Sequence, residues 1–133
     1  MFTTRRWTAI AFTVPIVELA LTSAYVHLTL GGFLFTANAI GYALLAVAYG
    51  LAAAADGTSF GRFGWMPRVA MFGFTLATIA GYLALGPWFT LGWVTKGVEV
   101  ALATLVAADI AVRYRSAAGL RDAVLGSGAS GGA

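Results

Sequence analysis

Charged side chains inside apolar stretches are the first residues of this sequence that could do chemistry. Glu18 lies in the run "TAIAFTVPIVELALTSAYVHLTL", and Lys96, Glu99 and Asp109 lie in "GWVTKGVEVALATLVAADIAVRYR". A charge at bilayer depth is costly unless it is paired, so such residues mark ligand sites, ion pathways or proton relays by default. The alternative role is structural, because polar side chains also form hydrogen bonds that join helices.

Uncharged polar residues extend these positions into stripes at helical spacing. The stripes are Glu18, Thr22, Tyr25 and Thr29 in the first apolar run, Asn38, Tyr42 and Tyr49 in the second, Thr75, Thr78 and Tyr82 in the third, and Lys96 and Glu99 in the fourth. One stripe on each helix predicts that all four stripes face inward and leave apolar side chains to the lipid.

Depth places most of this polarity towards one membrane surface. At about 1.5 Å per residue, Glu18 lies about 15 Å from the start of its helix, near the middle of a core about 30 Å thick. Asn38, Lys96 and Glu99 lie about 6 to 10 Å below the outer surface. We therefore expect an outward-facing polar cavity with Glu18 at its floor. The predicted substrate-binding or proton-coupling residues are Glu18, Tyr25, Asn38, Tyr42, Tyr82, Lys96 and Glu99.

Several of these residues also have simpler interpretations. Lys96 and Glu99 are three residues apart and can neutralise one another while Lys96 reaches the outer surface. Asp109 can pair with Arg113, four residues on, so we leave it out of the site. His27, the only histidine, falls on the face opposite Glu18, where we expect a hydrogen-bonded residue near the outer interface; a proton relay is the less favoured role. With a single histidine and no cysteine, we predict no metal or other cofactor.

The elements that must position these residues follow from the composition. Of 133 residues, 60% are hydrophobic and only 10% are charged, which leaves too few polar groups to cover a water-soluble fold of this size. Runs apolar and long enough to cross a bilayer lie near residues 7–30, 33–55, 68–86 and 92–113. Because short connections make consecutive helices antiparallel, we predict an all-α integral membrane protein, an up-down bundle of four transmembrane helices in one domain over residues 1–115.

Basic residues predict how this bundle is oriented. All seven arginines fall on one side of the predicted spans, and Lys96 alone falls towards the other. Short connections rich in Lys and Arg remain in the cytoplasm, so we expect both the N and C termini there, in a multi-pass protein of the plasma (inner) membrane. Residues 116–133 form a cytoplasmic tail; a short interfacial helix is expected within 113–125, and the last eight residues are predicted to be disordered.

One family resemblance bears on Glu18. A single glutamate in the middle of the first of four spans, in a chain of this length, is similar to the small multidrug resistance transporters. This resemblance implies proton and cation exchange at Glu18. The second-helix pattern of that family, with its tryptophan among small residues, is absent from "FTANAIGYALLAVAYG", and Lys96 and Glu99 are not part of the family pattern. We use the resemblance as an analogy and do not assign the chain to the family.

Two main hypotheses for function follow. In the first, the polar cavity serves small-solute or proton-linked transport, or ligand binding. In the second, the chain is an accessory or assembly subunit of a larger membrane complex, and the same polar groups join its helices or contact a second copy or another membrane protein. The small residues Gly73, Ala77 and Gly81 fit close packing either within the bundle or between chains. An enzyme acting on a lipid or isoprenoid, with Glu18 or Glu99 as acid or base, is less favoured because no nucleophile and base accompany them. The lipid bilayer is the surrounding partner, and nothing in the sequence indicates a nucleic acid.

Overall fold

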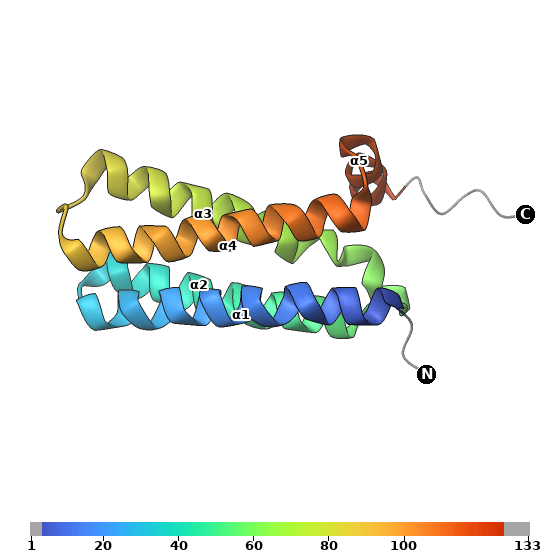
Figure 1. Ribbon diagram of the computed structural model, residues 1–133, viewed down its shortest axis with the longest axis horizontal. Coiled ribbons are helices and arrows are strands. Elements are labelled where there is room, and N and C mark those ends of the chain that lie inside the picture. The colour runs from blue at the N-terminus through green and yellow to red at the C-terminus, as the bar shows by residue number, and fades with distance from the viewer. Residues whose placement is uncertain (1–3, 127–133) are drawn as a thin grey trace, which may run out of the picture.

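Four long helices run side by side along the length of the molecule (Figure 1). The computed structural model describes residues 4–126, and all regular structure in that range is helical. The helices are α1 (Thr4–Leu30), α2 (Phe33–Ala54), the 3-10 helix η1 (Ser59–Phe63), α3 (Trp65–Leu85), α4 (Thr90–Tyr114) and α5 (Ala117–Leu125). The long helices coincide with the predicted apolar runs to within a few residues, and the predicted all-α class is confirmed.

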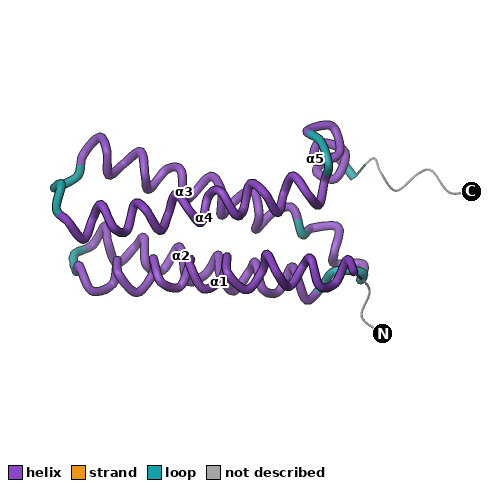
Figure 2. The backbone as a smooth tube through the Cα atoms, viewed as in Figure 1, coloured by secondary structure: helices purple, strands orange, loops and turns teal. Residues whose placement is uncertain are grey.

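The long helices alternate in direction, and only short turns join them at one end (Figure 2). α1 packs against α2, and α3 packs against α4; the two pairs meet where α1 contacts α4 and where α2 contacts α3. The α1–α2 turn consists of Gly31 and Gly32, whose φ angles of 69° and 87° are left-handed values that glycine adopts without steric cost. This turn and the Gly86–Pro87 turn form what we call the short-loop end. The start of α1 and the whole of α5 lie at the opposite end (Figure 1).

Three stretches of the described chain are long and apolar enough to cross a membrane, namely Trp7–Leu30, Phe33–Ala54 and Ser59–Leu85. They support the prediction of a multi-pass membrane protein. α4 has a similar length, but it carries four charged residues, Lys96, Glu99, Asp109 and Arg113. Lys96, Glu99 and Asp109 are buried inside the molecule. Between its two ends, the exposed side of α4 is therefore apolar apart from a threonine hydroxyl.

Small residues determine how α1 packs. Its buried face consists of Ile16, Ala20, Ser23, Ala24 and His27. Small side chains let two helix backbones approach closely, so this row faces α2 and α4, and the polar row does not. The prediction that the Glu18 face of α1 lines the interior is therefore wrong. The residues of that face, Glu18, Thr22, Tyr25 and Thr29, are exposed on the outside of the molecule.

A short helix follows α4, as the sequence predicted. Arg115 ends α4 with a left-handed φ of 62°, and the Ser116 hydroxyl caps α5 by accepting a hydrogen bond from the Gly119 amide at 3.0 Å. Leu120 is half-buried and Val124 is exposed. The predicted disorder of the last eight residues falls on positions that, from residue 127 onward, lie outside the described residues.

Candidate functional site

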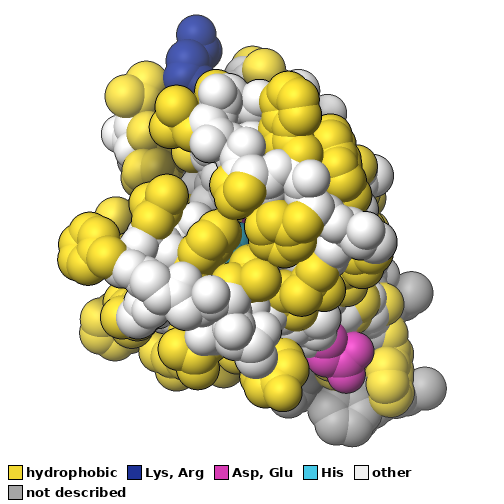
Figure 3. Space-filling model, turned by 90° about the vertical axis from the view of Figure 1, so that its left-hand side faces the viewer, with side chains coloured by type: hydrophobic (Ala, Val, Ile, Leu, Met, Phe, Trp, Pro, Cys, Tyr) yellow, Lys and Arg dark blue, Asp and Glu magenta, His cyan; other side chains and the backbone are white. Residues whose placement is uncertain are grey.

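A cleft of about 290 Å³ lies at the short-loop end, between α2 and α3. Its walls include Leu34, Phe35 and Asn38 of α2 and Phe74, Thr78 and Tyr82 of α3. The back of the cleft is formed by His27 of α1 and Lys96 of α4. The space-filling view onto this end shows histidine colour at the bottom of a hollow between apolar side chains (Figure 3), and His27 is the only histidine in the chain.

Aromatic packing closes the cleft at its inner end. The Phe74 ring lies against Gly41 of α2, where a Cβ atom would overlap the ring. The same ring meets Tyr42 edge-on, with 5.0 Å between the ring centroids. The Tyr42 hydroxyl lies 2.7 Å from Thr78 Oγ1, a hydrogen bond that also joins α2 to α3. The two helices therefore touch at this level, and the cleft lies between this contact and the short-loop end.

A buried group at the back of the cleft consists of Lys96, Glu99 and His27, and we call it the charged cluster. The Lys96 ammonium group donates a hydrogen bond to Glu99 Oε2, and it lies 5.2 Å from the centre of the Tyr82 ring. Glu99 is fully buried, whereas Lys96 is 7% exposed and borders the cleft. Lys96 thus lines the cleft, and Glu99 holds its ammonium group in the interior.

His27 of α1 places its Nε2 atom opposite an oxygen of Glu99. His27 Nδ1 lies 2.8 Å from the Ser23 carbonyl oxygen, which can only accept, so Nδ1 carries a hydrogen. His27 Nε2 faces Glu99 Oε1 at 3.5 Å, and Oε1 has no hydrogen-bond partner among the described side chains. A neutral ring would bring two acceptors face to face in a buried site. A second proton, on either Nε2 or the carboxyl group, removes that repulsion.

The structure brings most of the predicted site residues together at the cleft and the charged cluster. They are Asn38, Tyr42, Tyr82, Lys96 and Glu99. Glu18 and Tyr25 are not among them, because they lie on the outer face of α1, and Tyr25 is 69% exposed. Glu18 is therefore not the floor of this cavity. That place is taken by the contact of Phe74 with α2.

His27 is a site residue that the sequence did not predict. It does lie opposite Glu18, but that opposite face is the inner one. A signal for this was present in the sequence, since Ala20, Ser23 and Ala24 precede His27 on the same face. Rows of small residues are the usual contact surface of membrane helices, and this row would have turned His27 inward.

A second buried polar cluster lies towards the opposite end of the molecule. Arg68 Nε donates to Asp109 Oδ2 at 2.9 Å, and both residues are buried. The Tyr49 hydroxyl donates to the same oxygen. The predicted pairing of Asp109 with Arg113 is confirmed only as a longer contact of 3.8 Å, and the Arg113 guanidinium binds Asp56 Oδ2. Because α3 begins at Trp65, Arg68 lies inside that helix, where it reaches Asp109.

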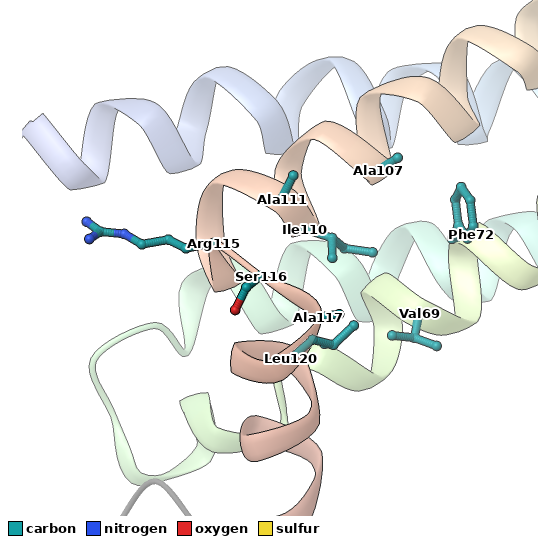
Figure 4. Close-up of a pocket in the computed structure, with 9 residues that line it drawn as sticks. All are labelled: Val69, Phe72, Ala107, Ile110, Ala111, Arg115, Ser116, Ala117 and Leu120. Carbon is teal, nitrogen blue, oxygen red and sulfur yellow. The ribbon is translucent and has the colours of Figure 1, made fainter.

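Another hollow, of about 400 Å³, lies where α3, α4 and α5 meet (Figure 4). Val69, Phe72 and Leu120 are among its lining residues, and the Arg115 side chain points away from them. The Ser116 hydroxyl is engaged in capping α5. Ligand sites use a few convergent polar groups to orient what they bind. The cleft has such groups and this hollow does not, so the cleft is the better candidate.

Comparisons with known proteins assign no family to this arrangement. No family model, curated protein or solved structure matches the chain. The function is therefore argued from the cleft and the charged cluster.

Proposed function

We propose that this chain is a small multi-pass membrane protein that binds a small solute in the cleft and links that binding to a proton, in transport or in ligand binding. The charged cluster is the observation that carries the proposal. Lys96 and His27 both line the cleft; Glu99 holds Lys96 from behind, and its free Oε1 faces His27 Nε2 at 3.5 Å. Ionisable groups within a membrane are expensive to keep and serve a function by default.

In the proposed arrangement α4 crosses the membrane together with the three apolar helices. It packs against both α1 and α3, and Lys96, Glu99 and Asp109 turn inward. A charged helix can face lipid in this way, because only its apolar side is exposed. The bias of arginines then places both termini in the cytoplasm. The short-loop end lies at the outer surface of the plasma membrane, and the cleft lies in the outer half of the bilayer.

The lining of the cleft favours a small amphiphilic solute with a head group that accepts hydrogen bonds. The Lys96 ammonium group and the Asn38 amide can donate, while Leu34, Phe35 and Phe74 provide apolar surface. A carboxylate accepts a charge-assisted hydrogen bond from an ammonium group, which is roughly twice as strong as one between neutral groups. The volume of about 290 Å³ is close to the lower limit of about 300 Å³ for ligand pockets, so the solute is expected to be small.

Solute and proton are linked through Glu99 in this proposal. An acidic head group that binds Lys96 weakens the contact of Lys96 with the Glu99 carboxylate, and a buried carboxylate without a partner is costly. A proton held between His27 and Glu99 offsets that cost. An acidic head group is therefore expected to bind more strongly when this proton is present. The other titratable groups around this contact are Tyr42 of α2 and Tyr82 of α3.

Thermal unfolding of the purified protein in lipid nanodiscs tests the proposal. The probes are benzoate, benzyl alcohol and benzylamine, which share one apolar body and differ in the head group. At about 100 times its dissociation constant, benzoate is expected to add about 2.7 kcal/mol of stability. Benzylamine is expected to add none, because its ammonium group is repelled by Lys96.

Variants at Lys96 show whether benzoate stabilises the protein by binding in the cleft. Lys96→Met keeps the apolar stem and removes the charge, and it is expected to abolish the benzoate effect. Because this change leaves Glu99 unpaired, the double variant Lys96→Met/Glu99→Gln is measured beside it. Arg121→Gln is the matched control, since its side chain is 70% exposed on α5. Equal stabilisation of the wild type and both Lys96 variants, or equal effects of all three probes, would contradict the proposal.

A second candidate function, as a subunit of a larger membrane complex, is favoured by the outward position of Glu18. A carboxyl group exposed at the middle of α1 calls for a partner outside its own chain. Native mass spectrometry of gently extracted membranes tests this alternative. A different protein at fixed stoichiometry would support it, and copies of this chain alone would count against it.

A further inference from the structure

The outer face of α1 carries a row of residues at a regular spacing. In chain order the row is Ala11, Pro15, Glu18, Thr22, Tyr25 and Thr29, separated alternately by four and three residues. Pro15 is half-buried and the others are exposed. Alternating steps of four and three form one straight seam, the spacing by which helices pack in left-handed coiled coils.

This row lies on a helix with the properties of a membrane span. The stretch Trp7–Leu30 is long and apolar enough to cross a bilayer, and Glu18 lies near its middle. Thr22 and Thr29 satisfy their hydroxyl hydrogens by donating to backbone carbonyl groups of α1 at 2.8 and 2.7 Å. The Glu18 carboxyl and the Tyr25 hydroxyl have no hydrogen-bond partner among the side chains of residues 7–126. A single chain therefore leaves this face incomplete.

We infer that the outer face of α1 binds a second copy of the chain, with the two α1 helices parallel and the two Glu18 residues near the shared axis. The row carries no basic residue, so a second copy offers no cation to it. A protonated carboxyl group and a phenol hydroxyl each donate and accept, which makes the face complementary to itself about a twofold axis. Leu21 and Leu28, exposed beside the row, pack across the same contact. Two copies inserted in one orientation make the helices parallel.

Cysteine crosslinking tests this contact without background, because the chain has no cysteine. A disulfide forms only where two Cα atoms come within about 7 Å. Thr22→Cys, on the row, is expected to give a crosslinked dimer when native membranes are mildly oxidised. Val47→Cys is the control, since Val47 is 60% exposed on α2 and away from the row. Crosslinking of Thr22→Cys no greater than that of Val47→Cys would overturn the inference.

Variants of Glu18 test what stabilises the dimer. Energy transfer between labelled copies in liposomes is expected to show association weakened roughly three- to fifteenfold by Glu18→Leu, the range expected for hydrogen bonds between membrane helices. Glu18→Gln still donates and accepts, so it is expected to associate as the wild type does. Unchanged association of Glu18→Leu would contradict a role for the carboxyl group. Because the changed side chain is exposed, circular dichroism is expected to show the same helix content in all three proteins.

Photo-crosslinking identifies the partner. With p-benzoylphenylalanine in place of Tyr25, irradiation of native membranes is expected to give a product of twice the chain mass. A product of a different mass would show that the partner is another protein, and this would overturn the inference. The contact lies on the face of α1 opposite the charged cluster, so it can hold or fail independently of solute binding in the cleft.

Discussion

Replacing Asp109 by asparagine tests which arginine holds this buried acid. The Arg68 side chain is fully buried and its Nε lies 2.9 Å from Asp109 Oδ2, so Asp109→Asn leaves a guanidinium group without its counter-charge. Breaking such a buried pair costs about 3 to 5 kcal/mol of unfolding free energy. Arg113 lies 3.8 Å from Asp109, and its closer partner, Asp56, is exposed to solvent. Arg113→Gln is therefore expected to cost about 1 kcal/mol or less.

Reversible unfolding in mixed micelles, followed by far-ultraviolet circular dichroism, measures both changes. The double variant Arg68→Met/Asp109→Leu removes both charges and leaves neither unpaired. It is expected to cost less than Arg68→Met or Asp109→Leu alone, because each of these single changes leaves one buried charge unpaired. If Arg113→Gln is as costly as Asp109→Asn, Arg68 is not the main partner. If the effects at Arg68 and Asp109 simply add, the two residues are not coupled.

Three further outcomes concern the cleft and α1. Because His27 is the only histidine, nitrogen-15 labelling of histidine gives the nuclear magnetic resonance spectrum of a single imidazole group. Glu99→Gln has an amide that can donate to His27 Nε2, so it is expected to change that spectrum. An identical spectrum would exclude a proton shared between His27 and Glu99. Gly41→Ala places a Cβ against Phe74, and thermal unfolding is expected to show a loss of about 1 to 3 kcal/mol and a smaller benzoate effect; wild-type values of both would refute the close contact. Glu18→Leu changes only the outer face of α1, so the benzoate effect is expected to persist, and its loss would place Glu18 at the site after all.

The positions of the helices could be predicted because they depend on local properties of the chain. Apolar runs of sufficient length become helices in lipid, since no other local structure satisfies their backbone groups there. Glycine and proline mark the turns, as at Gly31–Gly32 and Pro87. The co-facial spacing of Lys96 and Glu99 is equally local, and their contact could be read from the sequence in the same way.

The inward face of α1 could not be predicted from polarity alone. Its two faces offered different signals, polar residues around Glu18 on one and the small residues Ala20, Ser23 and Ala24 on the other. Close approach of α1 to α2 needs small side chains, so the face with the small residues turned inward. Polar residues of a membrane helix also face outward where another chain can satisfy them. Polarity therefore indicates that a contact exists, without indicating whether it lies within one chain or between two.

Contacts between residues on different helices could not be predicted for a related reason. Asp109 has Arg113 four residues away in the sequence, and that local pair is present as the longer contact. Its short contact, with Arg68, depends on where α3 begins and on how α3 is rotated against α4. Neither quantity follows from the spacing of residues within one helix.

The two acidic residues of α4 contact side chains on the other helices, and these contacts fix the position of α4 in the bundle. Glu99 meets His27 of α1, and Asp109 meets Arg68 of α3 and Tyr49 of α2. Such contacts are directional and costly to break in apolar surroundings, so we infer that they determine the rotation and depth of α4 more sharply than apolar packing can. The two acids differ in a respect that matters for function. The Asp109 contacts are direct and lie away from the cleft, whereas Glu99 Oε1 has no hydrogen-bond partner among the described side chains and lies behind the cleft. In the proposed function, Glu99 can therefore exchange its partner at the cleft while the Asp109 contacts continue to hold α4.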